Sequence, residues 1–367
     1  MATETPIFVE RNPAVIMAES KAMLEDLLGR ALQPAQVEQL MLQFVVYREV
    51  LLLERFNAGM AQMLYQFSKA PVLDYIAGLV AVERLPAARA GCTVRFTLVD
   101  GHGPVLIPEG TRVSTADGMV IFAITDDIAV PPEVNSVDIS AIAETPGKGG
   151  NGYAPGKVNV ILDPLAFVST VANLDTTGGG SDAETDEQLR ERIRLAPSQY
   201  STAGSRQSYL FHAKSANPLI TDISVSSPVP GTVLIVPLTA AGDTPQQVID
   251  DIYRVCSEED VRPLTDTVIV SAPTPRDYTI EVNLTLYENT DAEAVQSLVT
   301  GALSEYAQQK RELLGRDIIK SHIAQVCRVE SVYDVAVNAP AVNIIIGDSK
   351  FANCAGITVH ITGFNRG

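Results

Sequence analysis

At 367 residues the chain is long enough for two or three domains, and its 46% hydrophobic content is typical of a protein with well-packed cores. A formal net charge of −17 excludes general attraction to nucleic acid or to anionic lipid, because both are polyanions. The acidic N-terminus lacks the pattern of a secretory signal. Every apolar run is shorter than the roughly 20 residues that span a bilayer. We therefore expect no nucleic-acid binding, no membrane insertion and synthesis in a reducing cytosol.

Four cysteines lie far apart in the sequence, with no CxxC spacing. This arrangement favours buried thiols over a disulfide framework or a zinc cluster. The cysteines are Cys92, Cys256, Cys327 and Cys354.

Residues 1–90 are expected to form a helical N-terminal segment. A helix beginning near Pro34 and ending near Phe56 carries apolar residues around most of its circumference, which implies burial on several sides. Two explanations stay open: a central helix within its own bundle, or a helix that packs against another subunit. We favour packing against another subunit, because few helices lie nearby in the sequence that could cover a central helix of this kind. The candidate interface residues are Leu40, Met41, Phe44, Val45, Leu51 and Leu52.

A change to period-two alternation predicts a small β domain over residues 91–176, with strands near 93–99, 105–107, 113–115, 120–124 and 137–143. His102, in a glycine turn, is expected to be solvated, since one histidine and Asp100 are too few ligands for a metal. The run from Gly147 to Gly152 matches GxGxxG but is followed by Pro155 and not by a helix. We therefore expect no metal and no cofactor.

The segment 177–194 combines three glycines with an acidic, helix-forming stretch. Ser181 and Glu184 have capping-box spacing, and acids in a first turn suit the helix dipole. An anion cradle would need a basic residue there, so we predict a structural hinge and helix cap without catalytic residues. The residues of this hinge and cap are Gly179, Gly180, Ser181, Asp182 and Glu184.

The remainder predicts two related α+β units, at 177–272 and 273–367. Residues 220–228 resemble 332–340, each run follows a helix, and second strands are expected at 232–238 and 342–346. Strands with helices on one sheet face suggest a ferredoxin-like arrangement. The expected fold is thus α+β multidomain, with a helical segment, a small β domain and two ferredoxin-like units.

The run from Gly179 to Glu187, followed by Leu189-Arg190 and Arg192-Ile193, resembles the signature of the baseplate J-like family. Further similarity lies in the Gly147 to Gly156 connection, and the resemblance extends from about residue 70 to the C-terminus. Pro230-Gly231-Thr232-Val233 is a further supporting match. Similarity to the family's N-terminal part lies in Leu73-Asp74 through Arg84-Leu85 and in Pro108-Glu109-Gly110-Thr111. The length and the long N-terminal helix look most similar to Mu-like members.

This resemblance implies a structural wedge protein of a contractile phage tail or related injection system, and not an enzyme. In the family, two copies pair asymmetrically and join a tail protein I-like subunit, with N-terminal helices in an intersubunit bundle. Such units ring the central spike hub and connect to a lysozyme-fold wedge protein and the sheath. The implied location is the virion tail baseplate, and the host cytoplasm during assembly.

Two other functions stay open from the residues alone. A tail-tip wall hydrolase could use two carboxylates such as Glu184 and Asp186, although residues i and i+2 of a helix point to different faces. A glycan-binding tip protein could be built on the β domain, although aromatic residues make up only 6% of the chain.

Overall fold

The computed structural model describes residues 4–201, 204–240, 242, 244–263 and 265–366. The chain divides into two compact units, each described below by itself. Unit 1 comprises Met1–Arg84 and Thr185–Ala196, and unit 2 comprises Leu85–Glu184 and Pro197–Gly367. The fold is α+β and multidomain with N-terminal helices, which confirms the expected fold class. The domain boundaries expected at residues 90, 176 and 272 stay a prediction.

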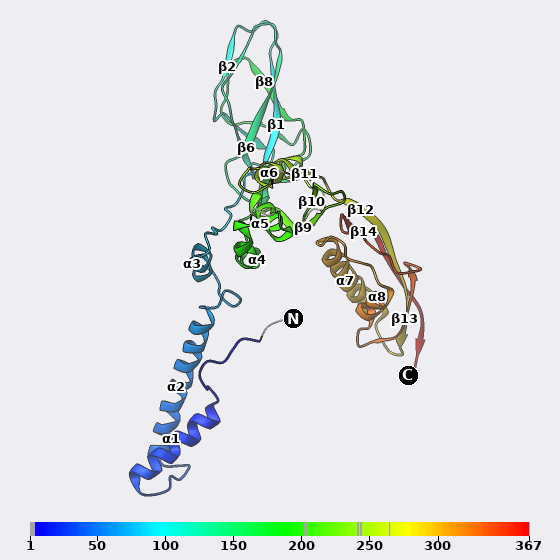
Figure 1. The fold of residues 1–367 in the computed structure, drawn as a ribbon. Coiled ribbons are helices and arrows are strands. Elements are labelled where there is room, and N and C mark those ends of the chain that lie inside the picture. Colours follow the sequence, from blue (N-terminus) through cyan, green and yellow to red (C-terminus); the bar gives the residue numbers. More distant parts are fainter. Residues whose placement is uncertain (1–3, 202–203, 241, 243, 264, 367) are drawn as a thin grey trace. The chain divides into compact units, whose positions relative to one another are not determined.

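Unit 1 contains the helical N-terminal segment that the sequence predicts. Its helices are α1 (Pro13–Leu28), α2 (Val37–Ala61), α3 (Val72–Gly78) and α4 (Asp186–Leu195). Asn12 caps α1 by accepting a hydrogen bond from the Ala14 N–H, and Gly29 ends it with a φ of +62°. Helices α1 and α2 lie side by side (Figure 1) and share a small apolar core.

The N-cap of α4 is Thr185, and the expected cap at Ser181 is wrong. Thr185 Oγ1 accepts from the Gln188 N–H while the Gln188 side chain accepts from the Thr185 N–H, which makes a complete capping box. Ser181 is unavailable as a cap because its backbone pairs with Ala88, in a short extended ladder. The helix therefore begins about one turn later than the sequence suggested.

The β domain of unit 2 is a nearly closed antiparallel barrel. Its main sheet has the strand order β7-β3-β4-β6-β1-β8, and β2 pairs with β5 in a second, two-stranded sheet. The outermost strands approach each other, since Asn173 Oδ1 accepts from the Val158 N–H at 2.9 Å. The strands are β1 (Gly91–Leu98), β2 (Val105–Ile107), β3 (Arg112–Thr115), β4 (Ile121–Ile124), β5 (Ile128–Val130), β6 (Ser136–Ala143), β7 (Val158–Ile161) and β8 (Val168–Asn173).

Alternation along the strands fills this barrel. In β1 every second side chain is buried, and the same alternation recurs in β6. The buried members in β1 are Cys92, Val94, Phe96 and Leu98. The period-two pattern in the sequence is therefore a genuine signal of an inward-facing core.

Two α+β modules follow in unit 2, each with a three-stranded mixed sheet. The central module contains α5 (Arg206–Ala216), β9 (Ile220–Ser226), β10 (Thr232–Thr239), α6 (Gln246–Cys256) and β11 (Thr267–Val270). The C-terminal module contains β12 (Thr274–Tyr287), α7 (Ala292–Arg311), α8 (Lys320–Cys327), β13 (Val332–Ala339) and β14 (Lys350–Asn365).

The ferredoxin-like detail needs correction. That arrangement has four strands, whereas each sheet has three among the described residues. The strand expected at 342–346 is also wrong. Ile344 makes one isolated bridge to Ile318, and β13 pairs with β12, whose other edge pairs with β14. The long central strand β12 therefore replaces the expected hairpin partner.

Candidate assembly surfaces

One side of α2 presents an exposed apolar surface. Phe44 is 66% exposed and Met41 64% exposed, and further exposed apolar side chains lie on the same side of the helix. We define the α2 apolar surface as the exposed apolar residues Val37, Leu40, Met41, Phe44, Val45, Tyr47, Leu52 and Phe56. Of the six predicted interface residues, five belong to this surface and Leu51 is partly buried.

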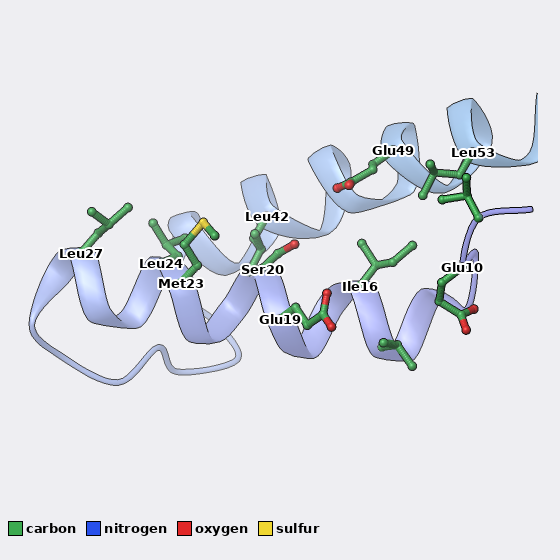
Figure 2. A pocket seen from close by; sticks show the side chains of 12 residues that line it. Glu10, Ile16, Glu19, Ser20, Met23, Leu24, Leu27, Leu42, Glu49 and Leu53 are labelled. Carbon is green, nitrogen blue, oxygen red and sulfur yellow. The ribbon is translucent and has the colours of Figure 1, made fainter. Parts of the chain in front are cut away.

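The opposite side of α2 packs on α1. Leu42 and Val46 are buried there with Ile16 and Leu32. A groove of about 640 Å³ lies between the two helices, and Figure 2 shows apolar side chains such as Leu24, Leu27 and Leu53 along it with Glu19 and Glu49. Unit 1 thus covers only one side of α2.

Asn57 fixes the chain before α1 against the later turns of α2. Its Oδ1 accepts from the Phe8 and Val9 N–H groups at 2.8 and 3.0 Å, and its Nδ2 donates to Val9 O and Leu53 O. All four hydrogen-bonding positions of this buried amide are used. The chain before α1 therefore lies on the buried side of α2 and leaves the α2 apolar surface exposed.

The predicted hinge and cap residues lie in a two-stranded connection at the base of the barrel. We call this connection the neck and define it as residues 85–91 and 178–184. Gly91 and Gly178 exchange backbone hydrogen bonds of 2.7 and 3.1 Å, and Ala88 and Ser181 exchange bonds of 2.9 and 3.1 Å. The neck joins the incoming and outgoing strands of the barrel, so the segment is an extended ladder and not a helix start.

Two glycines of the neck have different roles. Gly179 has a φ of +83°, a conformation that favours glycine, and a Cβ there would approach Gln247 Oε1 at 3.3 Å. Gly180 has no positive φ, but a Cβ there would collide with the carbonyl oxygen of Gly147 and lie 2.8 Å from Asn151 Oδ1. Gly180 is thus required by close packing against the Gly147 to Gly156 connection.

The acidic members of the predicted set are held by hydrogen bonds. Asp182 Oδ1 accepts from the Lys148 N–H at 3.2 Å, and its Oδ2 lies 3.1 Å from Lys148 Nζ, which together lower the pKa of Asp182. Glu184 is buried and its Oε2 accepts from the Leu85 N–H at 3.0 Å. Both carboxylates thus stabilise the neck.

Within unit 1, arginines join α4 to the segment around α3. Arg84 Nε lies 2.8 Å from Asp74 Oδ1, and Arg84 Nη2 lies 2.7 Å from Asp186 Oδ1. The hydrogen bond from Arg84 lowers the pKa of Asp186. The sequence analysis did not predict this pairing. One signal was present: Asp74 and Arg84 both lie in the stretch from Leu73 to Leu85 that resembles the family.

Metal-ligating side chains and thiols are the next candidate reactive groups among the described residues. No group of three or more metal-ligating side chains occurs in that part of the chain. The thiols are free, and burial raises the pKa of Cys92 and Cys256 to about 12, so these two are protonated at neutral pH. In the same described ranges, no helix combines the length and apolarity that a bilayer span requires.

Three family models match successive parts of this chain. Residues 93–180 match the baseplate J-like protein barrel domain, residues 201–272 the baseplate J-like central domain, and residues 278–360 the baseplate J-like protein C-terminal domain. Together these matches cover more than half of the chain. The first match coincides with the barrel and includes Gly178 to Gly180 of the neck.

Named relatives agree with the family models. The chain is 32% identical over 182 residues to baseplate protein J of Escherichia phage P2, covering 49% of this chain and 60% of that protein. It is 29% identical over 199 residues to the putative baseplate protein gp29 of Haemophilus phage HP1, covering 51% of this chain and 50% of that protein. The expectation of a Mu-like member is untested by these two relatives and stays a prediction.

A structural likeness covers nearly the whole chain. A chain in the cryo-EM structure of the anti-feeding prophage baseplate, 6-fold symmetrised, matches with a TM-score of 0.47 and 12% identity, over 96% of this chain and 100% of that chain.

The family assignment depends on the matches to the family models alone, because these cover most of unit 2 in chain order. The chain belongs to the baseplate J-like protein family.

Proposed function

We propose that this chain is a structural subunit of the baseplate of a contractile phage tail or related contractile injection system. The observation that carries the proposal is the α2 apolar surface, which unit 1 itself does not cover. Contiguous apolar surface of this kind marks a protein interaction site. The family, whose named relatives are baseplate proteins, supplies the setting for that interaction.

The finer proposal is that the chain forms inter-subunit wedges around the central hub. In it, two copies pair asymmetrically and join a tail protein I-like subunit, and the N-terminal helices lie in an intersubunit bundle. Further contacts would connect the wedge to a lysozyme-fold wedge protein, the spike and the sheath. Assembly would take place in the host cytoplasm, and the finished location would be the virion tail baseplate.

We further propose that the chain acts by holding position and not by catalysis. A wall hydrolase would need two carboxylates free to act on a sugar. Glu184 accepts a backbone hydrogen bond, and Asp186 is paired with Arg84. Both acids are therefore engaged structurally, which supports a scaffold over the hydrolase alternative.

The experiment substitutes Phe44→Asp in the full chain and measures association by sedimentation, alone and with a tail protein I-like subunit. We expect association to be lost, because burying an unpaired carboxylate at a subunit contact is costly. Gln43→Asp is the matched control: it adds the same charge to an exposed neighbour, about 100° around the helix. Unchanged association of Phe44→Asp, or equal loss in Gln43→Asp, would contradict the proposal.

A further inference from the structure

Unit 1 is built from two chain segments that are far apart in sequence. Residues 1–84 form the first, and residues 185–196, which contain α4, form the second. Helix α4 packs on α3, and Leu189 and Leu73 are fully buried. Because α3 has seven residues and α4 has ten, both are too short to be stable alone in water. Each helix therefore depends on its packing within unit 1.

Polar contacts between the segments centre on Arg84. Its guanidinium bonds Asp74 in the first segment and Asp186 in the second, at 2.8 and 2.7 Å. Arg84 and Asp186 are only 21% and 24% exposed at their side chains, so solvent screens this pair less than a surface pair. Asp186 Oδ2 also lies 3.4 Å from the Ala70 N–H.

Two arginines of α4 also reach backbone carbonyls of the first segment. Arg190 Nη2 donates to Ser68 O at 2.8 Å, and Arg192 Nη1 donates to Glu83 O at 3.0 Å. Arg192 is buried. The three arginines thus fix α4 to residues 68–84 at several points along that segment.

Arg84 bridges two carboxylates, one from each segment, so the contact between the segments depends on its charge. Both of its carboxylate partners bind the same guanidinium, so removing that cation leaves two negative charges close together. Like charges at such a separation repel each other. Loss of Arg84 therefore removes one ion pair between the segments and adds a repulsion to the contacts that remain, whereas loss of Asp186 only removes one attraction.

We propose that α4 is a strap that holds residues 68–84 through a latch centred on Arg84, and that breaking the latch releases the two segments together. The latch consists of Arg84, Asp74, Asp186, Arg190 and Arg192. In the released state residues 1–84 keep their peptide link at Arg84-Leu85 but lose their contacts with α4. The N-terminal helices then have two states: one packed against α4, and one joined to the rest of the chain only by the peptide link.

The experiment measures backbone hydrogen exchange in the full chain by mass spectrometry, for wild type, Arg84→Met, Asp186→Asn and the double variant. We expect Arg84→Met to speed exchange in residues 68–84 and 186–195 together, by at least about tenfold, since local opening controls exchange. The double variant should recover part of the protection, because removing Asp186 relieves the repulsion. Raising salt from about 0.05 to about 1 M should speed wild-type exchange in both segments.

The matched control is Arg112→Met, which breaks an exposed Arg112–Asp163 pair in the barrel and should leave both segments as in wild type. Unchanged exchange in Arg84→Met, or further loss of protection in the double variant, would overturn the proposal. If Arg84→Met also speeds exchange in the barrel strands, the Asp186→Asn variant is the deciding test, since its change is smaller. Faster exchange of Asp186→Asn in residues 68–84 and 186–195, with exchange in the barrel unchanged, supports the latch. Exchange of Asp186→Asn at the wild-type rate in both segments refutes it.

Discussion

Asn151 and Gly180 form a reciprocal pair at the base of the barrel. The Gly180 N–H donates to Asn151 Oδ1 at 2.8 Å, and Asn151 Nδ2 donates to Gly180 O at 2.7 Å. One side chain therefore satisfies both backbone groups of a glycine that lies against the Gly147 carbonyl. This pair joins the Gly147 to Gly156 connection to the neck and explains why two glycine-rich stretches occur in one domain.

Replacing Asn151 by Ala should destabilise the barrel by about 1–3 kcal/mol, because it leaves buried backbone groups of the neck without their partner. Urea unfolding of the full chain, followed by a barrel-specific probe, measures this change. Asn159→Ala is the control, since Asn159 is exposed and its side chain donates one bond to Gly156 O. Equal effects of the two substitutions would contradict the role given to Asn151.

Replacing Gly179 by Val should destabilise the neck by about 1–3 kcal/mol, because a β-branched residue tolerates a positive φ poorly. The same unfolding measurement tests it. Gly149→Ala provides the comparison, because Gly149 has open space around it and no positive φ. A Gly179→Val protein as stable as wild type would show that the left-handed conformation is unimportant.

Ser68→Ala should leave stability unchanged or raise it by up to about 1 kcal/mol, since the substitution removes a buried hydroxyl that makes no hydrogen bond to the described residues. Ser205→Ala should instead lower stability by about 1 kcal/mol, because Ser205 Oγ caps α5 by accepting from the Ser208 N–H. Thermal unfolding distinguishes the two. A larger loss for Ser68→Ala than for Ser205→Ala would refute this assignment.

Acid should weaken the barrel through Asp163. Its hydrogen bonds from the Arg112 guanidinium and the Arg112 N–H lower its pKa to about 2 in the folded chain. Because the folded pKa lies below the unfolded value, the stabilisation is fully present above about pH 4 and is lost as the pH falls toward about 2. In Asp163→Asn the barrel should lose less stability than wild type as the pH falls from about 4 to about 2, most clearly at low salt. An identical pH profile in wild type and variant would contradict this.

Local periodicity predicted much of the fold because it depends on neighbours in the chain. The burial alternation of β1 and the long helix α2 both follow from spacing alone. The exposure of Phe44 and Met41 also follows, since more apolar residues surround α2 than α1 can cover.

The failures occurred where a distant partner decided between local alternatives. The sequence predicted a cap at Ser181 with Glu184, whereas Thr185 with Gln188 forms the capping box, and the backbone of Ser181 pairs with the distant Ala88. His102 was expected to be solvated, yet it is buried. Its Nδ1 and Nε2 lie 2.6 and 3.0 Å from the carbonyl oxygens of Gly103 and Val134. The contact with Val134 spans 32 positions, so turn chemistry alone could not reveal it.

The α2 apolar surface can be tested directly by hydroxyl-radical labelling of Met41 and Phe44 in the free chain and in assembled baseplates. Both side chains are well exposed in the free chain, and Met119 of the barrel, which is 78% exposed, serves as an internal reference. We predict that assembly strongly reduces the labelling of Met41 and Phe44 relative to the free chain. Labelling of both residues that stays as high in the baseplate as in the free chain would contradict the claim that a partner covers this surface.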